Sequence, residues 1–494
     1  MIRMLPVFNL LVLLATAVLI PVFSKRVFTK IKQISTVAML FATVSSVISL
    51  AYVVQIEGYS IVFGGYTSAI GIELTIDAFS ALFAVFISAL AFLIIVYSFA
   101  DITHEIDEDQ YGSYYTLVFI LLFAMMGMTY TNDLFNMYVF MEILSLTSCA
   151  IISIKRKKAN YLAALRYLVL NTIGSLSVLM GIALIYMVSG HLNMGQISLI
   201  IRDIWQLYPG NIVVALGFIL TGLSIKAAVF PLHVWLPDAH SNAPTPSSAL
   251  LSSIVVKVYV IATIKLLFKV VGADIVTSLQ IPPVITIVAA LGMIMGSIFA
   301  IGQKDIKRML AYSSVAQIGY IFLGIGLMSE QGLSAALFHV ISHGFMKSAL
   351  FLSAGAIIYY KNRRNIKLFD GLGYQMPVTM IIFSFAALGM VGIPGFSGFM
   401  SKFYLLVAIL EAGVPFYLGV ILVSSYLNAV YYLPIIISAF LKEDKEGVRT
   451  MKVEKLPKSM LVPLIIIGVV IVSIGFYPQL IMQFIELAVA TLIN

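Results

Sequence analysis

Six basic residues lie inside long apolar stretches of this 494-residue chain: Arg166, Lys226, Lys257, Lys265, Lys347 and Lys402. A charged side chain in hydrocarbon costs about 3 kcal/mol or more, so it normally has a partner, contacts water or carries out a function. Lysine suits proton transfer in a dry site, because desolvation favours its neutral amine and a nearby carboxylate favours its ammonium form. Moving that carboxylate would make the lysine bind or release a proton.

Three more titratable residues fall in similar stretches. Glu142 is the clearest acid, in the run NMYVFMEILSLTS, and His339 and His343 lie one helical turn apart. A Glu–Lys pair followed by lysines and histidines predicts a proton relay near the membrane midplane. For an isolated pair, a static ion pair that pins two helices is the simpler interpretation. Here several such residues lie near mid-span, and Lys226 and Lys402 lie beside broken helices, which favours transport.

Metal and cofactor chemistry is not favoured. His339 and His343 could ligate a metal or haem from one helix face, but two histidines without nearby cysteine or carboxylate favour a hydrogen-bonded polar seam. Cys149 is the only cysteine, so the chain cannot form an internal disulfide, and one cysteine cannot hold an iron–sulfur cluster or structural zinc. We predict no metal and no cofactor here, and any redox centre must lie on another chain.

The composition places these residues in a polytopic membrane protein. Apolar residues make up 61% of the chain and charged residues only 11%, against roughly 45–50% and 25% in an ordinary soluble domain. This excludes a soluble enzyme. The net charge of +8 would suit nucleic acid, but the basic residues gather in short loops between apolar segments, so a lipid bilayer is the expected partner and nucleic acid is not.

Stretches of about 20 apolar residues bounded by charges, Pro or Gly predict fourteen all-α spans. They cover residues 5–23, 33–55, 76–99, 113–131, 134–153, 160–188, 211–230, 248–270, 282–301, 308–328, 331–358, 376–411, 415–440 and 458–476. Most Lys and Arg residues fall in five alternate loops, which identifies those loops as cytoplasmic and both termini as outside. The first span lacks a small-residue cleavage site and is expected to remain uncleaved.

Segments outside the relay carry expectations of their own. Residues 57–75 suit an outside hairpin, and the acidic stretch 101–109 is expected to be a solvated loop. Residues 477–494 are expected to form an interfacial helix. His233 and His240 are expected in a loop near a cytoplasmic entrance, and Lys265 is expected to extend its amine from a helix end to the interface.

Two broken helices suggest an internal repeat. The span with Lys226 breaks at Pro231 and Pro237, and the span with Lys402 breaks at GIPGFSG, residues 392–398. The two lysines are about as far apart in sequence as the starts of the fourth and ninth spans. This predicts two five-helix units, and an odd number of helices inverts the second unit. The expected divisions are 1–112, 113–270 (first repeat), 271–440 (second repeat) and 441–494.

Five motifs resemble a known family. They are KAAVFPLHVWLPDAHSNAPTPSSALLSS, TNDLFNMYVFMEILSL, QKDIKRMLAYSSVAQIGY, SHGFMKSALFL and GIPGFSGFMSKF. All look like the antiporter-like subunits shared by respiratory complex I, membrane-bound hydrogenases and Mrp-type cation/proton antiporters. The resemblance implies fourteen helices with two inverted five-helix repeats, in a prokaryotic plasma membrane.

The resemblance also implies roles for seven residues. Glu142 and Lys226 would form the proton-handling pair of the first half, Lys257 would bridge the halves, and Lys402 would be the terminal lysine of the second half. His339, His343 and Lys347 would form the central polar axis.

Lysine at position 402 and the short C-terminus look like the D-type subunit of Mrp antiporters or of Mrp-derived respiratory complexes. The implied partners are other membrane subunits of such a complex, H⁺, and Na⁺ where exchange is coupled to it. A stand-alone Na⁺/H⁺ antiporter and a redox-driven proton pump, such as a hydrogenase, a sulfur-reducing complex or an NADH-quinone oxidoreductase, both stay open.

Two other classes of function compete with transport. A redox enzyme that handles quinone within its own spans is disfavoured, because the chain lacks cluster-binding cysteines and a GxGxxG fingerprint after a strand. The other is a purely structural membrane scaffold, in which the buried charges only pin helices together.

Overall fold

The computed structural model describes residues 2–24, 28–65, 71–443 and 454–493. Its apolar segments are helical, because a helix satisfies its backbone hydrogen bonds within one segment and lipid offers none. Twelve helices of the described residues are long and apolar enough to cross a membrane. They are α1 (Leu5–Ser24), α2 (Phe28–Ile56), α3 (Ala78–Glu105), α4 (Tyr111–Tyr130), α5 (Leu134–Ser153), α6 (Lys158–Ser189), α8 (Pro209–Lys226), α13 (Pro282–Ile301), α14 (Ile306–Gly326), α15 (Glu330–Lys361), α19 (Phe416–Leu441) and α20 (Lys458–Phe476).

The other two predicted spans, 248–270 and 376–411, consist of segmented helices. The first is a run of α10 (Thr245–Leu250), a π-helical turn η3 (Leu251–Val255), α11 (Val256–Ile264) and a second π-helical stretch η4 (Lys265–Val271). The second is α17 (Pro377–Val391) and α18 (Ser397–Glu411). Gly392 and Gly395 between them have φ of +98° and +91°, which glycine adopts without strain. The total of fourteen spans and the inverted repeat stay predictions.

The predicted span 211–230 is too long at its end. Helix α8 stops at Lys226, and Ala228 adopts a positive φ of 55° that cannot continue a right-handed helix. A run of turns follows up to the short helix α9 (Leu236–Asn242). The break predicted at Pro231 therefore begins several residues earlier, directly beside Lys226.

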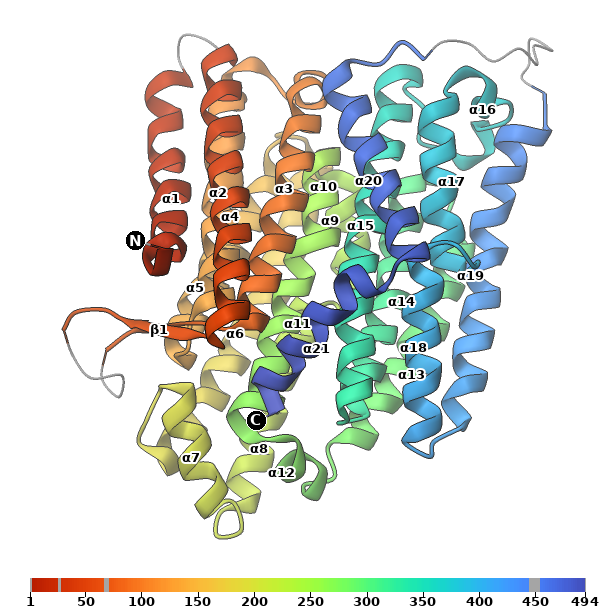
Figure 1. Ribbon diagram of the computed structural model, residues 1–494. Helices are drawn as coiled ribbons and strands as arrows, with labels where there is room; N and C mark the ends of the chain where they lie inside the picture. The colour runs from red at the N-terminus through yellow and green to blue at the C-terminus, as the bar shows by residue number, and fades with distance from the viewer. Residues whose placement is uncertain (1, 25–27, 66–70, 444–453, 494) are drawn as a thin grey trace.

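The remaining short elements lie between the spans or at the two ends of the described chain. They are η1 (Ile2–Met4), β1 (Tyr59–Val62), β2 (Glu73–Ile76), η2 (Glu108–Gln110), α7 (Met194–Ile204), α12 (Ala273–Ser278), η5 (Ile366–Leu368), α16 (Leu372–Gln375) and α21 (Gln479–Ile493). Helix α21 covers the predicted C-terminal helix and packs obliquely against α3 and α15 (Figure 1).

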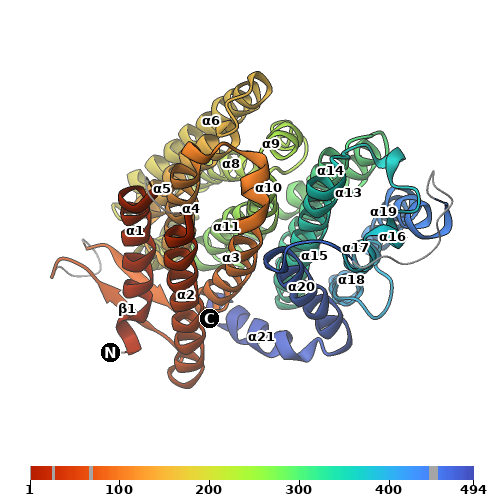
Figure 2. The same cartoon turned by 90° about the horizontal axis from the view of Figure 1, so that it is seen from above.

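The helices form two groups that meet along α15. Viewed from above, α1 to α11 lie on one side and α13 to α20 on the other, with α21 crossing the seam (Figure 2). Helices α14 and α15 are almost wholly buried, whereas only a third of α19 is buried. A helix surrounded by protein can carry polar groups that lipid would not tolerate. The three relay residues predicted on α15 therefore lie in the interior of the bundle.

The predicted hairpin exists and is tied to the bundle by one carboxylate. β1 and β2 pair antiparallel, with Val62 opposite Glu73. Glu73 Oε2 accepts hydrogen bonds of 2.8 Å from Asn132 Nδ2 and 2.7 Å from Asn193 Nδ2. Burial acts to raise the pKa of Glu73, but these hydrogen bonds outweigh it and the pKa is lowered. Glu73 thereby joins the hairpin to the connections before α5 and α7.

The acidic stretch 101–109 is not simply the solvated loop expected from the sequence. Helix α3 continues through Glu105, and Asp101 is only 1% exposed. The reason is tertiary: α10 and α15 pack against α3 and enclose its last turns. The exposed residues of this stretch are Thr103, His104 and the segment from Asp107 to Asp109.

Replacing Glu73 with alanine should destabilise the protein by about 2–4 kcal/mol, because the buried amides of Asn132 and Asn193 lose their acceptor. The lowered pKa means that Glu73 contributes this stability above its unfolded pKa and loses it as the pH falls through the folded pKa. The measurement is thermal unfolding in mild detergent at neutral and acidic pH. The exposed Glu57→Ala serves as control; equal unfolding temperatures for both variants would contradict the assignment.

Candidate functional site

The first part of the site is an ion pair between α5 and the end of α8. Lys226 Nζ lies 3.5 Å from Glu142 Oε1. The lysine side chain is fully buried, whereas the Glu142 side chain is 29% exposed. Because Lys226 is the last residue of α8, its charge also interacts favourably with the negative end of the helix dipole. The two predicted partners are thus brought together, and the carboxylate is the more accessible of the two.

Hydroxyl groups surround this pair. Lys226 Nζ donates a 2.6 Å hydrogen bond to Ser145 Oγ, and the Ser175 hydroxyl donates to Glu142 Oε1. Ser145 Oγ also lies 3.2 Å from the Tyr259 hydroxyl, which belongs to α11. The sequence predictions missed all three hydroxyl residues. Ser145 follows Glu142 by one helical turn, a spacing that could have identified it.

Lys257 occupies α11 directly after the first π-helical turn. It is 1% exposed, and its ammonium donates to the carbonyl oxygen of Ser252 in that turn. The Ser252 hydroxyl lies 2.8 Å from that of Ser314 on α14. Lys257 has no carboxylate partner among the described residues. A π-helical turn alters the regular i→i−4 ladder and so can offer a carbonyl to a side chain.

The predicted axis on α15 is a row of three buried residues on one helix face. The His339 and His343 rings are nearly parallel, with centroids 5.8 Å apart. His339 Nδ1 lies 2.8 Å from Ser401 Oγ, while neither ring nitrogen of His343 has a hydrogen-bond partner among the described residues. Lys347 Nζ donates to the carbonyl of Leu310 at 2.7 Å and to the Ser313 hydroxyl.

Lys402 is held by the broken helix. Its Nζ donates three hydrogen bonds of 2.9 Å, to the carbonyls of Met390 and Val391 and to Ser425 Oγ. Those carbonyls end α17, where the last C=O groups of a helix lack an intrahelical donor. Lys402 Nζ also lies 4.8 Å from the centre of the Tyr320 ring. The break at Gly392 thus creates the site that binds this ammonium.

The structure joins some of the seven predicted residues and leaves others apart. Glu142 contacts Lys226, His339 stacks on His343, and Ser401 links His339 to the helix that carries Lys402. No hydrogen bond joins Lys257 directly to Lys226 or Lys347 among the described residues.

Two residues behave differently from their sequence predictions. Lys265 does not extend to the interface; it is 2% exposed and donates to the carbonyls of Thr129 (2.5 Å) and Thr131 (3.0 Å) at the end of α4. His240 is not a loop residue, because it lies in α9 and is fully buried. His233 does lie in the turns before α9, but it is also buried. Neither correction was visible in the sequence, because both depend on neighbouring helices.

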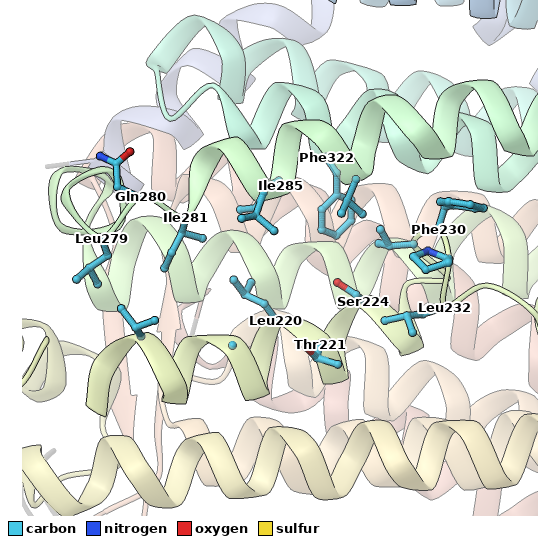
Figure 3. A pocket seen from close by; sticks show the side chains of 16 residues that line it. Leu220, Thr221, Ser224, Phe230, Leu232, Leu279, Gln280, Ile281, Ile285 and Phe322 are labelled. Atoms are coloured by element: carbon cyan, nitrogen blue, oxygen red, sulfur yellow. The ribbon is translucent and has the colours of Figure 1, made fainter. Parts of the chain in front are cut away.

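A groove beside the break after α8 does not reach the relay residues. It has a volume of about 370 Å³ and lies between α8, the following turns and α13. Leu220, Ile285 and Phe322 are among its mainly apolar lining residues (Figure 3). None of the seven predicted relay residues lines it. The groove has no charged lining residue and only a few polar ones, Thr221, Ser224 and Gln280, so the polar row inside the bundle is the better candidate site.

Comparisons with known proteins agree with this architecture. The family model described as "NADH:quinone oxidoreductase/Mrp antiporter, TM" matches residues 131–428. The NADH-quinone oxidoreductase subunit N of Desulforudis audaxviator is 37% identical over 456 residues, covering 90% of this chain and 89% of that protein. These matches confirm the resemblance predicted from the motifs.

Two solved structures match nearly the whole chain. A chain of the Mrp complex from Dietzia sp. matches with a TM-score of 0.90 and 26% identity, covering 100% of this chain and 98% of that one. A chain of the membrane-bound sulfane sulfur reductase, an archaeal respiratory membrane complex, matches with a TM-score of 0.91 and 30% identity. That match covers 99% of this chain and 98% of the other.

Lys265→Met should lower the free energy of unfolding by about 2 kcal/mol, because the carbonyls at the end of α4 lose a buried donor while the side-chain volume is nearly kept. Thermal unfolding of the purified protein in mild detergent measures the effect. Lys304→Met is the control, since Lys304 is exposed. A Lys265 variant as stable as the parent would show that those carbonyls do not need the lysine.

Proposed function

Because the chain belongs to the NADH:quinone oxidoreductase/Mrp antiporter family of membrane proteins, we propose that it moves protons as an antiporter-like subunit of a multisubunit complex. Protons pass from the side of the basic loops, near the break after α8, through Lys226 and Lys257. They continue along His339, His343 and Lys347 to Lys402, and the direction reverses when sodium drives the exchange. Glu142 controls Lys226 through its charge.

One observation carries this proposal: four lysines of the row are buried amines, and only Lys226 has a carboxylate partner among the described residues. The others are held by carbonyl and hydroxyl oxygens. Such oxygens accept hydrogen bonds from an ammonium without neutralising it. The charge state of each amine therefore responds to its neighbours, which a relay requires and a static ion pair does not.

The orientation is part of the proposal. The basic loops face the cytoplasm of a prokaryotic cell, its plasma membrane holds the complex, and both termini lie outside. The distribution of Lys and Arg supports this orientation.

Lys226→Ala should abolish coupled proton transport while the complex still assembles, because the first half of the relay loses its proton carrier. Proton flux per assembled complex in proteoliposomes is the measurement, and gel filtration checks assembly. Lys304→Ala, an exposed change in a basic loop, is the control. Normal flux through the assembled Lys226 variant would refute the relay.

A structural scaffold makes the opposite prediction. If the buried charges only pinned helices, Glu142→Gln and Lys402→Gln would lower the stability of the complex and leave the flux per assembled complex unchanged. The relay instead predicts reduced flux at full assembly.

The partners decide which complex the subunit serves. Mass spectrometry of the intact complex in mild detergent should find other membrane subunits. Small hydrophobic subunits alone would identify a stand-alone sodium/proton antiporter. Iron–sulfur or nickel-containing subunits would identify a pump driven by electron transfer.

A further inference from the structure

Two carboxyl groups lie buried at the end of α3 nearest the basic loops. Asp101 and Glu105 are one helical turn apart, on the same face. Asp101 is 1% exposed, and the Glu105 side chain is 8% exposed. The Asp101 and Glu105 carboxyl groups interact electrostatically. Two ionised carboxylates in such contact repel each other, whereas a carboxyl and a carboxylate can share one proton.

The two carboxyl groups have unequal surroundings. Glu105 is well satisfied, since Oε1 accepts a 2.8 Å hydrogen bond from the backbone N–H of Thr245 and Oε2 pairs with Lys155. Asp101 Oδ2 is buried with no hydrogen-bond partner among the described residues. Glu105 therefore has a structural task in holding the start of α10. The contacts of Asp101 reveal no comparable structural role.

A buried lysine lies close to these two carboxyl groups. Lys307 on α14 is 1% exposed and donates a 2.6 Å hydrogen bond to the carbonyl of Ala243, just after α9. It interacts electrostatically with both Glu105 and Asp101. The relay described above does not use Lys307.

His240 on α9 is the next group inward. Its ring stacks on Phe351 with centroids 5.3 Å apart, and neither ring nitrogen has a hydrogen-bond partner among the described residues. It is within electrostatic range of Lys307 on α14, Lys347 on α15 and Lys257 on α11. Lys347 Nζ lies 6.0 Å from the centre of the same Phe351 ring, so His240 and Lys347 contact one aromatic neighbour.

We propose that Asp101 and Glu105 form a proton-holding site on the basic-loop side, which supplies Lys257 and Lys347 through Lys307 and His240. Asp101 carboxylate takes up a proton and shares it with Glu105. The acid then gives this proton to the Lys307 amine, and the resulting ammonium passes it to the His240 imidazole. The imidazolium passes the proton to the amine of Lys257 or Lys347. Asp101, Lys307 and His240 then return to their starting protonation states. This second inlet rests on the proposed function and is separate from the Glu142–Lys226 pair.

The test uses the intact complex in proteoliposomes. Asp101→Asn keeps the shape of the side chain but cannot carry the proton, so proton flux per assembled complex should fall by about tenfold or more. Asp109→Asn is the matched control, because Asp109 is exposed and pairs with Arg156 at 2.9 Å. It should leave the flux unchanged.

An infrared measurement separates a proton-carrying role from a structural one. Difference spectra between acidic and alkaline medium should contain a carboxylic-acid C=O band that is lost in Asp101→Asn and retained in Asp109→Asn. Normal flux with Asp101→Asn, or an unchanged C=O band, would overturn the proposal. If Lys226→Ala still abolishes transport in that case, only the second inlet fails. If Lys226→Ala transports normally, the proposed function fails whatever Asp101 does.

Discussion

The structure depends on one constraint: a buried ammonium needs oxygen atoms around it, and most carbonyls of an intact helix already accept a backbone hydrogen bond. Lys402 binds carbonyls at the end of α17, and Lys265 binds those at the end of α4. Lys257 uses a carbonyl of a π-helical turn, and Lys226 ends its own helix. Helix breaks and buried lysines therefore occur together because each makes the other possible.

The same constraint explains why α14 and α15 are central. Both are surrounded by other helices, so hydroxyl, imidazole and amine groups on them face protein rather than lipid. Lys347 illustrates this, since its ligands are a carbonyl and a hydroxyl of α14. The more exposed helices, such as α19, present large apolar side chains to the surroundings.

Connections between distant segments keep the two groups of helices in register. Helix α21, at the end of the chain, packs against α3 and α15 across the seam between them. Within the first group, Glu73 ties the hairpin to Asn132 and Asn193. Small movements of α15 relative to its neighbours would change the ligands of Lys347 and His339 together.

The sequence by itself determined the membrane class, most of the helix positions and the residues of the polar row. Hydropathy and the placement of Lys and Arg are local properties that survive without a fold, and charges in apolar segments are conspicuous because they are costly. The motifs around Lys226 and Lys402 also identified the family. The partnership of Glu142 with Lys226 followed from that resemblance.

Tertiary structure alone decided what each polar group touches. The sequence around Asp101 and His240 is polar and predicts loops at both positions. In the structure, helices that are distant in sequence enclose both residues. Lys265 resembled a residue at a helix end whose amine reaches the interface, but the carbonyls of α4, more than a hundred residues earlier, bind it instead. Burial and hydrogen-bond partners depend on which helices pack together, and local residue patterns carry little of that information.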